Sequence, residues 1–175
     1  MPHLRHLDAT VKRLSPYNAD MRTLILLLAL SLLTACSTPP ARQDAIRDTR
    51  DARMNELVMY AMSLAETPYR YGGNSAATGF DCSGYVGHVY REVLDIRLPR
   101  TSREISKVGT PLSQRELSPG DLVFFNTRHR PYSHVGIYVG DGKFVHSPRT
   151  GSQIRVENMD FDYWKARYNG ARRIN

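Results

Sequence analysis

The pattern of apolar residues changes near residue 110, and this change constrains the fold more than any other feature of the sequence. Before it, apolar residues recur at helical spacing, in residues 43–65 and again in SGYVGHVYREVL from Ser83 onward. After it, short apolar or alternating runs are separated by Pro-Gly, Asp-Gly and polar turns, which predicts strands at DLVFFN, HVGIYVG, KFVHS and IRVENM. Helices followed by strands joined through short turns predict an α+β domain with a mostly antiparallel sheet.

The remaining segments complete this expectation. Pro68 is expected to end the first helix. The sequence LPRTSREISKVG predicts a turn and a short helix, and FDYWKARYNGARRIN predicts a short helix and a closing strand. Cys82 would then lie at or beside the first turn of the second helix.

An apolar run from Leu24 to Leu33 is followed by small residues and Cys36. The run is shorter than the roughly 20 residues that span a bilayer, but it suits the apolar part of a secretory signal peptide. The sequence LTAC is similar to a bacterial lipobox, which implies that Cys36 is acylated and begins the mature protein. The alternative is ordinary signal cleavage, with Cys36 incidental. Because residues 1–20 are polar and mixed in charge, we expect translation to start at Met21.

The expected organisation follows from this segment. Residues 1–35 would be an N-terminal extension and signal peptide, 36–52 the lipidated cysteine and its tether, and 53–175 a single folded domain. If the lipobox is interpreted as in diderm bacteria, Ser37 favours an outer-membrane anchor facing the periplasm. We expect a monomer, because no feature of the sequence indicates oligomerisation. We also expect acyl chains to hold the protein at the membrane.

The chain carries a formal charge of +7, and its first 35 residues hold four Lys or Arg against two Asp, which leaves +5 on the remainder. Such a balance favours an anionic partner. An exported protein rarely meets nucleic acid, and the basic residues are scattered along the sequence. We therefore expect no nucleic-acid partner, and either a mild bias toward an envelope polymer or only a solvated basic surface.

The second cysteine, Cys82, stands in GFDCSGYV at the expected helix start. If Cys36 is acylated, Cys82 has no disulfide partner in an oxidising compartment, which points to a reactive thiol. A helix N-terminus lowers the pKa of a thiol and favours the nucleophilic thiolate. The competing interpretation is a small core residue.

A nucleophilic thiol needs a base, and the strand region offers His129, His134 and His146. A two-residue loop at Asp141-Gly142 would place His134 and His146 on opposite faces of the hairpin. A three-residue loop, residues 140–142, would place Gly136 opposite His146 and His134 diagonally on the same face. This second register predicts Gly142 at positive φ in a bulge.

In that register Cys82 attacks, His134 takes its proton and later delivers it to the leaving amine, and His146 holds His134 in the useful tautomer. No metal is expected, because two histidines without a matching set of Cys or carboxylate ligands are a weak signal, and no cofactor is implied. We expect His88 to be structural and His129 to lie in a surface or substrate-facing loop.

Five segments in this order, TPYRYGG, GFDCSGYV, PGDLVFF, SHVGIYVG and KFVHS, resemble the NlpC-type cell-wall peptidases, which are papain-like cysteine peptidases of bacteria. The resemblance covers roughly residues 53–172. It implies a papain-like fold with Cys82 as nucleophile, His134 as base and His146 as third polar residue. It also implies a peptidoglycan stem-peptide substrate, cut most often between γ-D-glutamate and diaminopimelate.

The resemblance further implies that a tyrosine before the Gly-Gly pair lines the site, and Tyr69 matches it. Tyr71 competes, because the loop before the nucleophile is about one residue longer than in close relatives. Asp81 and Ser83 would contact the amine-bearing end of a wall peptide, or else cap the helix. The oxyanion would be held by the backbone N–H of Cys82 and a side chain such as Tyr69. Rival functions are an amidase or acyltransferase of the same fold and a non-catalytic wall-binding lipoprotein.

Overall fold

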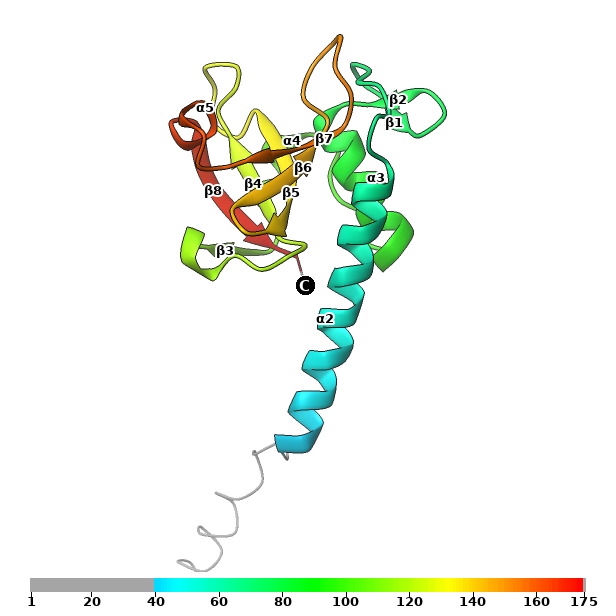
Figure 1. Cartoon of the computed structure of the whole chain (residues 1–175), viewed down its shortest axis with the longest axis vertical. Helices are drawn as coiled ribbons and strands as arrows, with labels where there is room; N and C mark the ends of the chain where they lie inside the picture. The colour runs from blue at the N-terminus through cyan, green and yellow to red at the C-terminus, as the bar shows by residue number, and fades with distance from the viewer. Residues whose placement is uncertain (1–39, 175) are drawn as a thin grey trace, which may run out of the picture. The chain divides into compact units, whose positions relative to one another are not determined.

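This computed structural model describes residues 40–174 of the chain. A six-stranded antiparallel sheet lies at the centre of the fold (Figure 1). The strands lie in the order β3-β8-β4-β5-β6-β7. Their bounds are Thr110–Leu112 for β3, Leu122–Phe125 for β4, His134–Gly140 for β5, Lys143–His146 for β6, Arg155–Asn158 for β7 and Tyr168–Arg173 for β8. The four predicted strands thus correspond to β4 to β7, and the closing strand corresponds to β8.

Helices precede and interrupt the sheet as expected. They are α2 at Pro40–Ser63, α3 at Cys82–Leu94, α4 at Ser102–Ile105 and α5 at Asp162–Lys165, with a 3-10 turn at Gln114–Glu116. A two-stranded hairpin of β1 (Asn74–Ser75) and β2 (Gly79–Phe80), which the sequence did not predict, stands just before α3. The α+β prediction is confirmed. Helix α2 ends ahead of Pro68, and it begins within the segment expected to be a tether.

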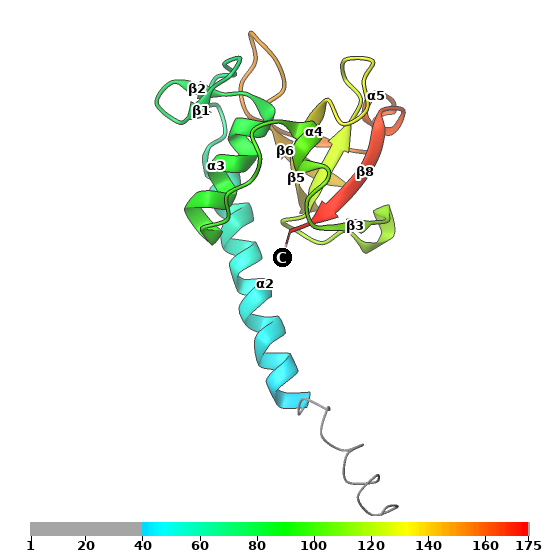
Figure 2. The same cartoon turned by 180° about the vertical axis from the view of Figure 1, so that it is seen from behind.

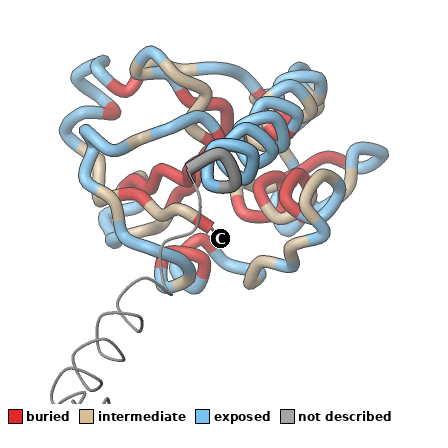
Figure 3. Tube along the Cα trace, turned by 90° about the horizontal axis from the view of Figure 1, so that it is seen from below, coloured by how far each residue is buried: buried red, intermediate tan, exposed pale blue. Residues whose placement is uncertain are grey.

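The larger core lies where α3 and the C-terminal half of α2 meet one face of the sheet. Figure 3 shows buried segments gathered along α3 and the strands, whereas most of α2 is exposed. Two tyrosine hydroxyls tie the layers: Tyr85 donates to the carbonyl of Ala61 at 2.8 Å, and Tyr90 donates to that of Gly120 at 2.5 Å. The apolar residues that recur at helical spacing in α3 therefore form the face of the helix that packs on the sheet.

A second core covers the opposite face. In β4, Leu122 and Phe124 belong to the larger core, whereas Val123 and Phe125 pack into the smaller one. All four side chains are fully buried. This explains why the run LVFF is continuously apolar rather than alternating, because the strand is covered on both faces. Trp164 of α5 closes the smaller core.

The hairpin between β5 and β6 differs from both registers considered above. Gly140 pairs with Lys143, as in a two-residue loop, and both loop residues have positive φ, 51° at Asp141 and 69° at Gly142. The register then shifts between Tyr138 and Gly140, so that Ile137 pairs with Val145. The predicted positive φ of Gly142 is confirmed, but the three-residue loop is wrong.

The extra residue in the hairpin is accommodated in β5, where Gly140 has a φ of 103°. Extending the pairing of Ile137 with Val145 by one residue places Gly136 against His146. A bulge thus produces the same-face arrangement that we expected from a longer loop.

The strand β8 lies between β3 and β4, with Leu112 opposite Ala171 on one side and Leu122 opposite Arg172 on the other. Figure 2, seen from behind, shows β8 and β3 side by side. None of the described helices is both long and apolar enough to cross a membrane. Cys36 and the predicted signal segment lie outside the described residues.

Candidate active site

Cys82 is the first residue of α3, and the loop before it is held by close backbone contacts. Asp81 is the N-cap, with its Oδ1 accepting from the N–H of Gly84 at 2.7 Å and its own N–H donating to the carbonyl of Gly73 at 3.0 Å. A Cβ on Gly84 would lie 2.0 Å from the carbonyl oxygen of Gly73. The glycines in GGNSAATGFDCSG therefore allow the loop to lie directly against the start of the helix.

His134 begins β5 and His146 ends β6, so the hairpin presents both rings on one face. The Nε2 of His134 lies 2.7 Å from the Nδ1 of His146. The rings are nearly perpendicular, at 88°, and both side chains are buried. Two neutral imidazoles can share this contact only if one nitrogen donates and the other accepts.

The thiol of Cys82 lies beside the start of β5, where the backbone N–H groups of Val135 and Ser83 act on it and partly offset the rise of its pKa. Val135 directly follows His134. Within residues 40–174 the thiol forms no hydrogen bond with either histidine ring. Catalytic hydrogen bonds are often long before substrate binds, and the Nδ1 of His134 is the ring nitrogen not engaged by His146.

Burial, joined by the charge of Asp81, raises the pKa of Cys82 to about 11. Burial, joined by the charge of Arg128, lowers the pKa of His134 to about 3. For His146, burial, the neighbouring ring of His134 and the positive charge of Arg155 lower the pKa well below its usual range. The resting site at neutral pH is therefore a thiol beside two neutral imidazoles. The thiolate expected from the helix N-terminus is not favoured, because desolvation outweighs that contribution.

Asp81 is fully occupied within the protein. Besides capping the helix, it accepts from Ser83 Oγ at 3.1 Å, from the N–H of Gly72 at 3.1 Å, and from Arg100 at 3.0 and 2.7 Å. Burial alone would raise the pKa of Asp81, but these hydrogen bonds, with Arg100 foremost, lower it. The capping role considered for Asp81 is confirmed.

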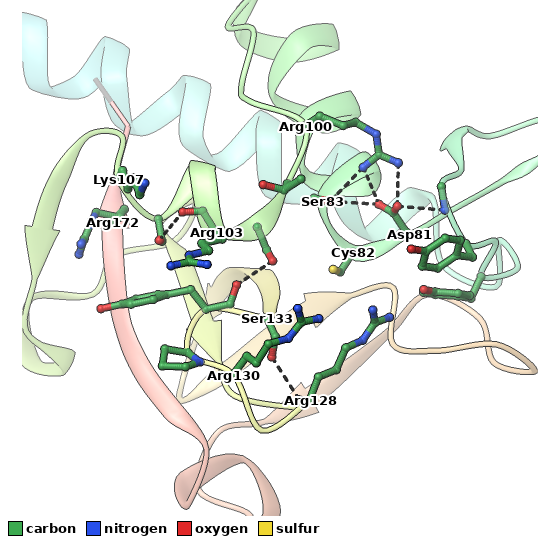
Figure 4. Close-up of a pocket in the computed structure, with 18 residues that line it drawn as sticks. Asp81, Cys82, Ser83, Arg100, Arg103, Lys107, Arg128, Arg130, Ser133 and Arg172 are labelled. Atoms are coloured by element: carbon green, nitrogen blue, oxygen red, sulfur yellow. Dashed lines mark hydrogen bonds and ion pairs between the residues drawn. The ribbon is translucent and has the colours of Figure 1, made fainter.

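A cleft of about 910 Å³ opens over the thiol. Both tyrosine candidates line it, Tyr69 half-buried and Tyr71 exposed, together with Asp81 and Ser83. Figure 4 shows the sulfur of Cys82 between the Asp81–Arg100 pair and the side chains of Arg128 and Arg130. The three residues predicted to meet substrate, and Tyr71 as the alternative to Tyr69, therefore all line the cleft that holds the Cys82 thiol.

Two residues of this site were missed from the sequence. Arg100 binds both Asp81 and Ser83, at 3.0 Å from the Oγ of Ser83. Trp164 stacks on His134, with ring centroids 5.8 Å apart, and meets His146 edge to face at 5.0 Å. A basic residue in a loop and a lone tryptophan in a short helix carry no sequence signal for such contacts.

The described residues contain no group of three or more side chains suited to hold a metal ion. His88 does not contact His134 or His146 among the described residues. Its Nε2 lies 3.0 Å from the hydroxyl of Tyr60, and its Nδ1 lies 3.1 Å from Arg91. His129 is exposed in the loop between β4 and β5.

The NlpC/P60 family model matches residues 66–173 of this chain. Murein DD-endopeptidase MepH of Escherichia coli K12 is 43% identical over 141 residues, which are 77% of this chain and 52% of MepH. The probable endopeptidase NlpC of the same strain is 36% identical over 159 residues, 88% of this chain and 100% of NlpC. The chain thus spans about half the length of MepH but all of NlpC.

Solved structures share the fold. An NlpC/P60 family protein from Bacillus cereus ATCC 10987 has a TM-score of 0.64 and 32% identity, over 69% of this chain and 39% of that one. The NlpC/p60 domain of the peptidoglycan hydrolase SagA has a TM-score of 0.59 and 29% identity, over 67% of this chain and 96% of that domain. The papain-like α+β fold expected from the sequence is confirmed.

Proposed function

Because the chain belongs to the NlpC/P60 family, we propose that it is a peptidoglycan hydrolase of the cysteine peptidase type. Cys82 is the nucleophile, His134 the general base and His146 the residue that orients His134. The observation that carries this proposal is the contact of 2.7 Å between His134 Nε2 and His146 Nδ1, in which His134 begins β5 next to Val135, whose backbone lies beside the Cys82 thiol.

The tautomers follow from that contact. If His134 donates its Nε2–H to the Nδ1 of His146, a lone pair remains on the Nδ1 of His134. His146 then carries its proton on Nε2, a buried atom with no hydrogen-bond partner among the described residues. A third residue that accepts without carrying charge lets both histidines stay neutral in a buried site.

The reaction then begins with a neutral thiol. As the sulfur of Cys82 attacks the carbonyl carbon, its proton passes to Nδ1 of His134, and the carbonyl becomes an oxyanion. The backbone N–H of Cys82 and the hydroxyl of Tyr69 are the proposed oxyanion donors. Collapse breaks the C–N bond, and His134 returns the proton to the leaving amine. Water, deprotonated by His134, hydrolyses the thioester and releases Cys82.

For the bond, we propose the amide between γ-D-glutamate and diaminopimelate of the stem peptide. Gamma-DL-glutamyl hydrolase of Bacillus subtilis is 37% identical over 120 residues, 68% of this chain and 29% of that protein, which supports this choice. MepH, named a DD-endopeptidase, makes the D-alanyl cross-link the second candidate. Tyr69, Asp81 and Ser83 are the proposed substrate contacts. Because Asp81 is already paired, it would act through its charge together with Arg100.

We further propose that the protein is exported and acylated at Cys36, with residues 1–35 removed, 36–52 as the membrane-proximal segment and 53–175 as the catalytic domain. The anchor would lie in the outer membrane and face the periplasm, and the protein would act as a monomer.

The test is digestion of purified peptidoglycan and defined muropeptides by the purified chain beside Cys82→Ala, with products identified by mass spectrometry. Release of an L-alanyl-γ-D-glutamyl fragment by the wild type alone is the expected result. Release of D-alanine-linked fragments would move the cut to the cross-link. Transfer of the acyl group to an added amine would favour the acyltransferase alternative, and binding without any product would favour the wall-binding one.

A further inference from the structure

One wall of the cleft is strongly basic. The residues that line the cleft include six cationic side chains and one carboxylate, that of Asp81. Arg100 is the cation that pairs with Asp81, at 2.7 Å. We call the other five the basic rim: Arg103, Lys107, Arg128, Arg130 and Arg172.

The basic rim is assembled by the fold from separate parts of the chain. Arg103 and Lys107 come from α4 and the turn after it, Arg128 and Arg130 from the loop between β4 and β5, and Arg172 from β8. Figure 4 shows these side chains around the same hollow as the thiol of Cys82. These residues are scattered along the sequence, and the fold gathers the five of them around one cleft.

Within residues 40–174, the five cations have no carboxylate to neutralise them. Among the described residues, no carboxylate forms an ion pair with any member of the basic rim. Four of the five side chains are exposed and Arg172 is half-buried. Like charges gathered in a concave site raise the local potential and attract anions. An ordinary solvated surface would mix the two signs.

The loop that carries Arg128 and Arg130 is anchored to its surroundings. The Oγ of Ser133 accepts from the N–H groups of Thr127 and Arg128 at 3.0 and 3.2 Å. Tyr132 donates its N–H to Asn169 at 2.9 Å, and its carbonyl accepts from Ser102 at 2.7 Å. These bonds tie the loop to α4 and β8, which carry the rest of the basic rim, so the cations keep their place over the cleft.

We propose that the basic rim binds carboxylate groups of the peptide that Cys82 cleaves, so that the enzyme selects acidic stem peptides whose carboxyl groups are free. This inference rests on the proposed function and deepens it. Arginine suits the task, because its guanidinium can hold a carboxylate through two parallel hydrogen bonds.

The test uses a pair of muropeptides that differ only in whether their free carboxyl groups are amidated. The variant is Arg103→Gln/Arg130→Gln, which leaves in place Arg128, the cation whose charge lowers the pKa of His134. Arg115→Gln, an exposed arginine outside the cleft, is the matched control. With the free acid, the double variant should raise KM roughly tenfold with kcat within about twofold, because each exposed ion pair contributes up to about 1 kcal/mol.

Amidation should raise the KM of the wild type and of the control, and it should raise that of the double variant, which keeps three of the five cations, by a smaller factor. Added salt should likewise raise KM in the wild type more than in the double variant. Equal KM values for the two muropeptides in the wild type would overturn the inference. A double variant that discriminates between the two muropeptides as strongly as the wild type would also overturn the inference. The carboxylates would then be recognised by residues other than Arg103 and Arg130.

Binding separates this inference from the proposed function. Calorimetry with the Cys82→Ala chain measures affinity for both muropeptides without cleavage, and the free acid should bind roughly tenfold more tightly than the amide. If the wild type cleaves neither muropeptide while this preference remains, the hydrolase proposal fails and the carboxylate site stands. If affinity depends on the basic rim but ignores amidation, the cations hold another anion and the inference fails.

Discussion

The indole of Trp164 lies over the imidazole of His134, with ring centroids 5.8 Å apart and planes inclined by 26°. The same indole meets the ring of His146 at 89°. One buried side chain therefore packs on both members of the histidine pair and shields them from water. Trp164 is in this sense a positioning residue, because it acts through His134 and His146.

Replacing Trp164 with alanine should therefore change the histidines as well as the stability of the domain. Removing a buried tryptophan costs about 3–5 kcal/mol, and water entering the space should raise the pKa of His134 toward its usual range. Trp164→Phe keeps an aromatic ring and should retain most of both properties. NMR titration of the histidines and urea unfolding measure the two effects. A fully folded Trp164→Ala domain with an unchanged His134 pKa would contradict the shielding role.

His146 should contribute through its acceptor nitrogen. His146→Ala should lower kcat by roughly 100-fold, because His134 loses the partner that fixes its tautomer. His146→Gln, whose side-chain oxygen can accept the same hydrogen bond, should recover part of kcat. KM should change little in both variants. Steady-state kinetics on one muropeptide test this, and equal kcat values for alanine and wild type would exclude the orienting role.

The resting protonation state predicts how the thiol responds to pH. With the pKa of Cys82 at about 11 and that of His134 at about 3, both groups are neutral over the intervening range. The rate of iodoacetamide alkylation should therefore be slower at pH 7 than that of a free model thiol and should still be rising above pH 9. Alkylation followed by mass spectrometry measures it. A rate that is already constant below pH 7 would reveal a preformed thiolate.

Two glycines of α3 offer a matched pair for stability. A Cβ at Gly84 would meet the carbonyl oxygen of Gly73 at 2.0 Å, whereas nothing lies within 4 Å of a Cβ at Gly87. Gly84→Ala should destabilise the domain by roughly 2 kcal/mol or more, because backbone must move. Gly87→Ala should stabilise it by up to about 1 kcal/mol through helix propensity. Urea unfolding of both variants measures these changes in the free energy of unfolding. A stable, active Gly84→Ala chain would refute the close packing of Gly84 against Gly73.

Acylation at Cys36 is tested in cells of a host that processes bacterial lipoproteins. The full-length chain should incorporate labelled palmitate and partition with membranes, and Cys36→Ser should lose both properties. Cys82→Ser, which removes the other cysteine, should keep both. Soluble wild-type protein without label would favour ordinary signal cleavage.

Periodicity was enough to predict the helix start at Cys82 and the strands that carry the two histidines. The register of their hairpin could not be obtained in this way, because Gly140, Asp141 and Gly142 all adopt positive φ and permit more than one loop. Only the pairing of Tyr138 with Phe144 shows where the extra residue lies. The two histidines lie on the same face of the sheet, as predicted, but a bulge in β5 places them there and not a longer turn.

The surroundings of the site were harder to predict, for a different reason. Trp164 and Arg172 are distant in sequence from Cys82 and reach the site only because β8 lies inside the sheet. Arg100 pairs with Asp81, which lies 19 positions earlier in the chain. Contacts of this kind depend on strand order, which local patterns do not encode.

The position of β8 also governs when the domain can form. Because Tyr168–Arg173 lies between β3 and β4, the sheet stays divided until these residues are available. Contacts between such distant segments form slowly, because a long loop must close before they contribute. If the protein is exported as proposed, a chain still emerging from a secretion channel would hold Cys82 without its finished cleft. The order of the strands by itself delays assembly of the surroundings of Cys82 until almost the whole domain is available.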